Sequence, residues 1–193
     1  MKTKAFADLV RENRSRRRFY QDASIDYGTL KELVELARLT PSARNQQPLK
    51  YILSNAAEKN DKIFSCLSWA LDLKGWGGPT EGERPSAYII ILGDTEIAKT
   101  FGCDHGIAAQ TIMLGAVDKG LGGCIMASIK KDRLRDLLAI PERYEILLTL
   151  ALGKPKEPVI VEPVGKSGDV KYWRDSLGAH HVPKRALDDI IVG

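Results

Sequence analysis

The sequence predicts an α+β domain in which helices cover a β-sheet. Segments with helical periodicity and apolar β-branched runs follow one another without the regular strand–helix–strand order of a doubly wound fold. The chain has 193 residues, of which 44% are hydrophobic and 28% charged, and this is enough to bury one core. Because it contains no internal repeat and no linker, we expect a single domain over residues 1–193.

Two helices and a loop are predicted in the first quarter of the chain. Apolar residues at helical spacing indicate a short helix that ends near Asn13 and a second helix over residues 27–39. Asp26 is the expected N-cap of the second helix, and Pro41 stops it. The polar loop PSARNQQP follows.

Four apolar segments predict the core of the domain. LKYILS, residues 49–54, is expected to be extended, and AYIIILG, residues 87–93, to be a buried central strand. Residues 106–117 are apolar nearly all round at helical length, which predicts a buried helix. GLGGCIMAS, residues 120–128, predicts a glycine turn that leads into a short buried strand.

The remaining segments carry weaker signals. An amphipathic helix stopped by Pro141 and a strand ended by Gly153 are expected. Residues 56–86 carry a poor signal, and the piece LKGWGGPTEGERPS (73–86) within them is rich in Gly and Pro, which favours a mobile or binding loop. Residues 155–193 have little core-forming periodicity, so we expect this extension to drape over something else, most simply a partner subunit.

Five arginines gather near the start of the chain: Arg11, Arg14, Arg16, Arg17 and Arg18. The net charge is only +4 and acids follow closely, which argues against a nucleic-acid surface. If this segment is extended, Ser15 and Arg17 lie on one side and the other arginines on the opposite side. At most part of the cluster can then face one phosphate, for which Arg14, Ser15 and Arg17 are the candidates, and we expect Arg11, Arg16 and Arg18 to be solvated.

The cysteines and histidines do not predict a metal or nucleophilic site. The three cysteines lack CxxC spacing, so buried free thiols in a reducing cytoplasm are expected. Cys103, Asp104 and His105 would point in different directions on a helix. A metal bound by His180 and His181 would need carboxylates brought from afar.

Other features favour a cytoplasmic protein whose chemistry is carried by a cofactor. No segment has the apolar length of a signal peptide or a membrane span, so no membrane partner is expected. GLGGC lacks the GxGxxG spacing of a dinucleotide-binding turn. Gly122 and Gly123 would still let the backbone pass close to a flat ligand. Trp69 and Trp76 are candidates to cover such a ligand. Without an acid–base or nucleophile set, a cofactor is expected to react.

Four stretches, in order, resemble motifs of the nitroreductase family of FMN-dependent oxidoreductases. They are NRSRRRF (13–19), TPSARNQQP (40–48), the stretch from Asp104 to Ser128, and PKRALDDII (183–191). The resemblance implies a mixed, mainly antiparallel sheet flanked by helices. It also implies an intertwined homodimer with FMN at the interface and residues 155–193 draped on the partner.

The resemblance also implies which residues bind the cofactor. Arg14, Ser15 and Arg17 correspond to residues that hold the FMN phosphate and ribityl chain, with Arg185 joining from the tail. Arg17 would also stabilise charge at N1 and O2 of the flavin, while flavin N5 carries the chemistry. Contacts to the ring are implied for Pro41, Ser42, Ala43, Asn45, Gln47, Gln110, Met126, Ala127 and Ser128.

Some positions depart from the family pattern. Many members have a basic residue where Asn13 stands, so Arg16 or Lys184 would have to supply a phosphate contact. Residues 56–85, which would shape access for substrates, match no family pattern. Lys74 in that region is a candidate to contact the pyrimidine side of the flavin.

The implied activity is ping-pong transfer of hydride from NAD(P)H through FMN to a nitroaromatic or quinone. Three alternatives stay open: another FMN chemistry on the same fold, such as reductive dehalogenation or flavin fragmentation, a flavin-binding protein without turnover, and an arginine-rich module that binds anions or nucleic acid. The arginine module predicts salt-dependent binding of nucleic acid and a colourless protein.

Overall fold

Strand β5 (Tyr144–Pro155) organises the main sheet because it is long enough to pair along both of its edges. Strand β3 (Ala87–Asp94) pairs with one edge and β4 (Gly122–Met126) with the other, and β1 (Phe19–Tyr20) pairs with the last two residues of β5. Strand β2 (Leu49–Ser54) completes the sheet beside β3, and every one of these pairings is antiparallel. The predicted α+β class and mainly antiparallel sheet are confirmed.

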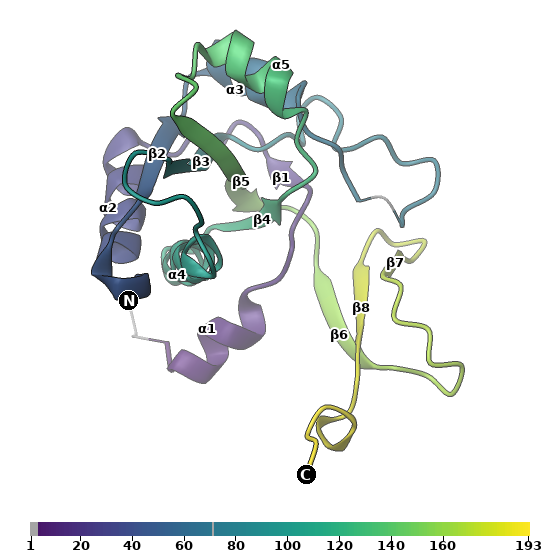
Figure 1. Cartoon of the computed structure of the whole chain (residues 1–193). Helices are drawn as coiled ribbons and strands as arrows, with labels where there is room; N and C mark the ends of the chain where they lie inside the picture. The colour runs from purple at the N-terminus through teal and green to yellow at the C-terminus, as the bar shows by residue number, and fades with distance from the viewer. Residues whose placement is uncertain (1–3, 71) are drawn as a thin grey trace.

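The computed structural model describes residues 4–70 and 72–193, and Figure 1 shows helices on both faces of the main sheet. On one face, α2 (Tyr27–Arg38) and α4 (Asp104–Asp118) pack against alternate residues of β3 and β5. On the other face, α3 (Ala57–Phe64) and α5 (Lys131–Leu138) pack against the intervening residues. A strand buried on both faces has to be apolar throughout, which explains why β3 was visible in the sequence.

The predicted helices and strands of the first half form close to their expected bounds. Helix α1 (Phe6–Glu12) has Asn13 as its C-cap, and Asp26 caps α2 by accepting a hydrogen bond from the Thr29 N–H at 2.9 Å. The predicted buried helix forms as α4, but only one side of it is buried, and Gln110 is exposed on the other side. None of the helices in the described ranges is long and apolar enough to cross a membrane.

Three element boundaries differ from the prediction. Helix α3 forms within residues 56–86, ahead of the predicted loop, where no helix was predicted. Strand β5 continues through Gly153, because a residue without a side chain leaves room for the Phe19 ring, whose nearest atom lies 2.7 Å from where a Cβ would be. Helix α5 ends before Pro141, at Ala139, which adopts a left-handed conformation with φ of 49°.

The C-terminal extension, in which little core-forming periodicity was found, forms a small sheet. We call residues 156–193 the tail and residues 4–155 the body. Strands β6 (Val159–Pro163) and β8 (His180–Lys184) pair in parallel, and β7 (Trp173–Arg174) adds to β8 antiparallel. A single 3₁₀ turn, Leu187–Asp189, follows β8 near the end of the chain.

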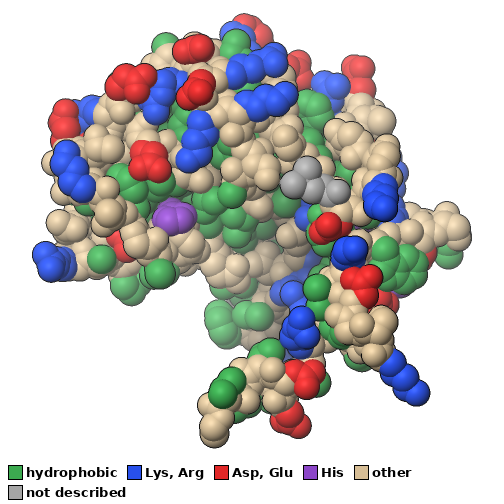
Figure 2. Space-filling model, turned by 45° about the vertical axis from the view of Figure 1, so that its right-hand side comes forward, with side chains coloured by type: hydrophobic (Ala, Val, Ile, Leu, Met, Phe, Trp, Pro, Cys, Tyr) green, Lys and Arg blue, Asp and Glu red, His purple; other side chains and the backbone are tan. Residues whose placement is uncertain are grey.

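The tail projects from the body rather than covering it (Figures 1 and 2). Figure 2 shows a hollow between the two parts. On the face in that view, acidic and basic side chains are interspersed over the upper part of the body. This mixed distribution does not fit a surface that binds a polyanion.

Candidate functional site

The arginine-rich segment runs in an extended conformation beside strand β4. Ser15 forms a parallel bridge with Gly123, and the Arg16 N–H donates to the Gly123 carbonyl at 2.8 Å. Side chains therefore alternate, and Ser15 and Arg17 both lie near the Cys124 thiol. Burial raises the pKa of that thiol, and Arg17 and Ser15 oppose the shift.

Arg14 has a buried donor next to the exposed Ser15. Its Nη2 donates to the Val10 carbonyl at 2.8 Å, while its Nε is buried and contacts no acceptor among the described residues. A buried N–H group is normally paired, so an unpaired one in a charged side chain calls for an acceptor. Arg14 therefore offers a buried donor to an anionic group such as a phosphate.

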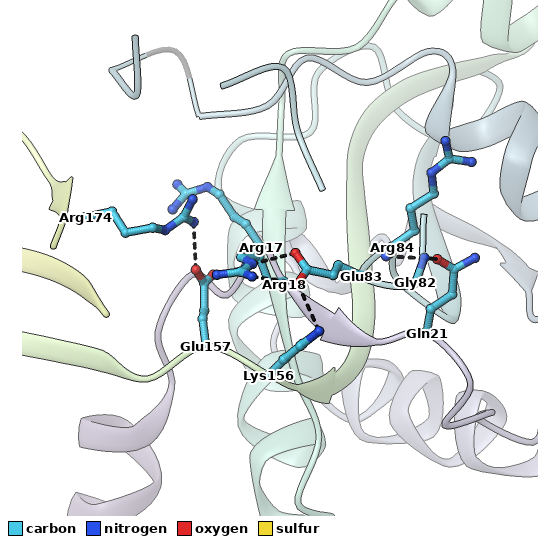
Figure 3. Close-up of polar contacts among 9 residues, drawn as sticks. All are labelled: Arg17, Arg18, Gln21, Gly82, Glu83, Arg84, Lys156, Glu157 and Arg174. Atoms are coloured by element: carbon cyan, nitrogen blue, oxygen red, sulfur yellow. Dashed lines mark hydrogen bonds and ion pairs between the residues drawn. The ribbon is translucent and has the colours of Figure 1, made fainter. Parts of the chain in front are cut away.

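Arg17 connects β4 with the tail. Its backbone N–H donates to Glu157 Oε1 at 2.6 Å, its Nη1 lies 3.1 Å from His180 Nε2, and its guanidinium stacks 4.8 Å from the centre of the Tyr172 ring. Burial, followed by the charge of Arg17, lowers the pKa of His180 to about 4, so this imidazole is neutral and accepts the hydrogen bond. Figure 3 shows Arg17 among the charged residues that surround Glu157.

Arg16 and Arg18 are not solvated, which corrects the expectation for both. Arg18 donates through Nε and Nη2 to the two carboxylate oxygens of Glu83 at 2.5 and 2.6 Å (Figure 3). These bonds, with a further contact from Lys156, lower the pKa of Glu83 to about 2. Arg16 Nη1 donates to the Glu157 carbonyl at 2.6 Å. Only Arg11 is a surface residue, as expected, and it pairs with Asp8.

The predicted ring-contact loop is held in place by Asp104 at the start of α4. This buried carboxylate accepts from Ser42 Oγ at 2.6 Å and from the Ala43 N–H at 3.1 Å. Asn45 and Gln47 have positive φ angles of 55° and 51°, and the Gln47 N–H donates to Ser42 Oγ at 3.0 Å. Sequence reasoning discounted Asp104 as part of a nucleophile set, and its spacing from this loop gave no signal of the contact.

The remaining ring-contact candidates lie on α4 and just after β4. Gln110 Oε1 accepts from Asn13 Nδ2 at 3.3 Å, which brings two candidates together. Met126 is buried at the end of β4, and Ala127 and Ser128 are exposed. The carbonyls of Ala127 and Ser128 accept backbone hydrogen bonds, but no described residue accepts from their N–H groups.

The single chain divides the candidates into separate groups. Asn13 to Arg17 lie with Gln110 beside β4, whereas Pro41 to Gln47 lie at the other end of α4, about 9 Å along the helix from Gln110. Lys184 and Arg185 are exposed, and Figure 1 shows the end of β8 pointing away from the main sheet. No hydrogen bond between described residues joins these three groups.

Residues that the sequence suggested for a flat ligand have packing roles in the single chain. A Cβ on Gly123 would meet the Ala151 carbonyl oxygen at 2.3 Å, so close packing on β5 already requires a glycine here. Trp69 is a core residue that packs against Phe64 with ring centres 5.7 Å apart. Trp76 contacts the tail, because the Arg174 guanidinium lies 4.7 Å from its ring.

The cysteines and histidines also differ in part from expectation. Cys66 and Cys124 are buried free thiols, but Cys103 is exposed. His181 lies between two carboxylates of the tail itself, Glu162 at 2.9 Å and Asp175 at 3.3 Å. The described residues nevertheless contain no group of side chains that could hold a metal ion.

Comparison with known proteins indicates one family. The sequence model of the nitroreductase family matches residues 83–154, which include β3, α4 and β4. This part of the chain is therefore similar to the nitroreductase family, which the relatives and the solved structures also indicate. A protein of Archaeoglobus fulgidus, provisionally named an NADH dehydrogenase/NAD(P)H nitroreductase, is 26% identical over 72% of this chain and 80% of its own length.

Solved nitroreductase structures share the fold. A nitroreductase family protein from Streptococcus pneumoniae superimposes with a TM-score of 0.72 at 19% identity, over 98% of this chain and all of the other. A protein of Exiguobacterium sibiricum, provisionally named a nitroreductase and solved in complex with FMN, gives a TM-score of 0.68 at 17% identity. That match covers 88% of this chain and 98% of the other.

Proposed function

We propose that this protein is an FMN-dependent oxidoreductase of the nitroreductase family. It would take hydride from NADH or NADPH and deliver it to an electron-poor acceptor, such as a nitroaromatic or a quinone, by ping-pong kinetics. The provisional name of the Archaeoglobus relative and the FMN complex of the Exiguobacterium protein support this assignment. The observation that carries it is the buried, unpaired Nε of Arg14 beside the exposed hydroxyl of Ser15.

Arg14 and Ser15 would hold the FMN phosphate. A guanidinium and a hydroxyl on adjacent residues supply charge-assisted and neutral hydrogen bonds to one group. Asn13 adds no charge and is already bonded to Gln110, so Lys184 or Arg185 would have to come from a second copy of the chain. Arg16 is directed toward Glu157 and is a weaker candidate for this role.

The ring would lie toward the end of β4. When bound, FMN supplies hydride acceptance and donation at N5. The unused N–H groups of Ala127 and Ser128 are available to hold a ring edge. Arg17 carries a positive charge that the neutral His180 does not cancel, and a fixed donor of this kind stabilises negative charge that develops near N1 and O2. The protein needs no general base of its own for this chemistry.

We further propose that the protein is a homodimer in which the tail contacts the partner subunit. Several apolar side chains of the tail are largely exposed in the single chain: Leu177, Leu187, Ile190, Ile191 and Val192. Ile107 and Gln110 on α4 are exposed as well, and the loop of Pro41 to Gln47 is separated from the phosphate candidates. A second copy that covers these surfaces would bring the separate groups into one site.

The visible spectrum of the purified protein tests the proposal. After reconstitution with FMN, we expect a flavin absorbance that NADH or NADPH bleaches under anaerobic conditions. Replacing Arg14 with Gln and Ser15 with Ala should weaken FMN binding at least about tenfold, since each charged hydrogen bond contributes roughly 1.5–3 kcal/mol. Arg11→Gln is the matched control, because Arg11 is exposed and pairs only with Asp8.

The outcomes separate the alternatives. Protein that stays colourless after reconstitution contradicts the assignment. Protein that is yellow but is not bleached by either nicotinamide is a flavin binder without this activity. An Arg14→Gln, Ser15→Ala variant with the FMN affinity of the Arg11→Gln control would show that the phosphate is held elsewhere.

A further inference from the structure

A polar cavity lies outside the candidate cofactor site. It has a volume of about 160 Å³ and opens between α3, the end of β2, the segment that follows β1, and the start of β3. The residues that matter for its chemistry are Asn60, Asp61, Phe64, Arg84, Ser86 and Tyr88. Figure 3 shows that the Arg84 side chain points away from the Arg18–Glu83 pair, so this cavity is separate from the arginine cluster.

Three of these residues present buried polar atoms that have no partner among the described residues. They are Arg84 Nε, Ser86 Oγ and Tyr88 Oη. Tyr88 is only 1% exposed, and burial raises its pKa, so its hydroxyl keeps its proton and can donate. Three unpaired donors around one cavity are unusual, because buried polar groups are nearly always hydrogen-bonded.

Two further polar side chains of the cavity, Asn60 and Gln21, are already paired. Asn60 donates to the Ser86 carbonyl at 2.8 Å and accepts from Ser54 at 2.7 Å. Gln21 Oε1 accepts from the N–H groups of Gly82 and Arg84 at 2.8 and 3.1 Å, as Figure 3 shows. The surrounding network is therefore ordered, and the unpaired donors are not the result of loose local packing.

A comparison with Arg18 indicates which group the donors fit. Arg18 uses its Nε and Nη2 to bind both oxygens of the Glu83 carboxylate. In Arg84 only Nη1 has a described partner, Asp61 at 3.4 Å, and the Nε edge is free. A planar guanidinium edge of this kind matches a carboxylate in bidentate geometry.

We propose that this cavity binds a small aliphatic carboxylate. The carboxylate would lie on the Nε edge of Arg84 and accept from the hydroxyls of Ser86 and Tyr88, with its alkyl chain near Phe64. A cavity of about this size holds a molecule of roughly six non-hydrogen atoms, as the binding of benzene by an engineered 150 Å³ cavity shows. Arg84 is held over the Phe64 ring at 4.5 Å and its side chain is one-third exposed, which provides both orientation and an access route.

Butyrate and its uncharged amide, butyramide, are the probes that test this. With the full-length protein, calorimetry should detect saturable binding of butyrate, and butyramide should bind at least about tenfold more weakly, because it cannot accept from the whole guanidinium edge. Arg84→Gln should weaken butyrate binding about tenfold or more. Arg38→Gln is the matched control. Arg38 lies on an exposed helix surface outside the cavity, and its guanidinium edge is already occupied by the Glu35 carboxylate.

Two further variants distinguish a binding site from a structural feature. Tyr88→Phe should weaken butyrate binding about threefold to tenfold without lowering the melting temperature of the ligand-free protein, because the hydroxyl it removes is unpaired. Asp61→Asn should tighten binding about twofold, because it removes a nearby negative charge that is largely exposed. A variant that binds more tightly cannot be explained by misfolding.

The results that would overturn the proposal are specific. Equal affinity for butyrate and butyramide, or no saturable binding of either, would show that the cavity is not a carboxylate site. A crystal structure grown in butyrate with ordered water alone around Arg84 would do the same. Flavin content and bleaching by NADH should be unchanged in all these variants, so failure here is distinguishable from failure of the proposed oxidoreductase activity.

Discussion

The body and the tail are stabilised by different interactions. The body is built around β3, in which Ile89, Ile90 and Ile91 are fully buried between two layers of helices. The tail has three short strands whose contacts are mainly polar, with His181 at their centre. Glu157, at the start of the tail, joins the two parts. Its carboxylate accepts hydrogen bonds from Arg174 in the tail and from the backbone N–H of Arg17 in the body.

The difference has consequences for stability and for function. Apolar burial depends little on pH or salt, whereas hydrogen bonds between charged groups depend on both. The body should therefore unfold as a cooperative unit, and the tail should open at lower cost. Since the tail contacts Arg17, its opening would also free a residue of the candidate cofactor site.

The largest effect is expected from truncating the core of the body. Ile90→Ala should lower the free energy of unfolding by about 3 kcal/mol or more, because it leaves a cavity between packed layers. The same substitution in the tail, Ile160→Ala, should cost less than about 1 kcal/mol, because that side chain is 42% exposed. Urea denaturation measures both, and equal losses would contradict the distinction between the two regions.

The junction should give the next largest effect. Glu157 is buried and accepts from Arg174 at 2.7 Å, so Glu157→Gln leaves a cation without its partner at a cost of roughly 2–3 kcal/mol. Hydrogen exchange should speed up in the tail and stay unchanged in β3. The exposed Glu81→Gln is the control. Faster exchange throughout the body would mean that the tail is part of the same cooperative unit.

The same contrast explains what could be predicted from the sequence. Strand β3 and helix α4 were visible because burial imposes an apolar pattern on neighbouring residues. The tail sheet was not visible, because β6 and β8 are only five residues long and pair in parallel across a long connection. Helix α3 was missed because Ile63 and the buried Asn60 give too little apolar periodicity.

Site residues divide in the same way. Motif resemblance located Arg14 and Ser15, and the alternation of an extended chain separated their two sides. The partners of Arg18 and Asp104 could not be predicted, because Glu83 and Ser42 lie more than sixty residues away in the chain. Pairing at such separations is set by the fold and leaves no local pattern.

Adjacent histidines should make the stability of the tail depend on pH in both directions. His181 forms hydrogen bonds to Glu162 and, more weakly, to Asp175, and these raise its pKa. The stability that protonated His181 contributes to the tail is therefore present below the ordinary histidine pKa of about 6.5, and it is lost as the pH rises through the raised pKa. Burial lowers the pKa of His180 to about 4, so stability is lost as the pH falls from about 6.5 toward that value.

Protection of tail amides, corrected for intrinsic exchange rates, should therefore be greatest near the ordinary histidine pKa. His181→Gln should remove the decline on the alkaline side, and His180→Gln the decline on the acidic side. The groups that face these rings are Glu162 and Asp175 for His181, and Arg17, Glu157 and Arg174 for His180. Tail protection that is flat across this range would show that neither ring controls the stability of the tail.

The smallest effect on the single chain is expected at its C-terminal end, where Ile191 is largely exposed. Ile191→Asp should change the free energy of unfolding of the monomer by no more than about 0.5 kcal/mol, because an exposed side chain has little burial to lose. If the tail covers a partner subunit, the same change places a charge in an apolar contact and should weaken the dimer about tenfold or more. Sedimentation equilibrium measures this, with Asp189→Asn in the preceding 3₁₀ turn as the control. An unchanged dimer dissociation constant would show that this end of the tail stays in solvent. The contrast between a buried body and an exposed tail would then hold in the assembled protein as well as in the single chain.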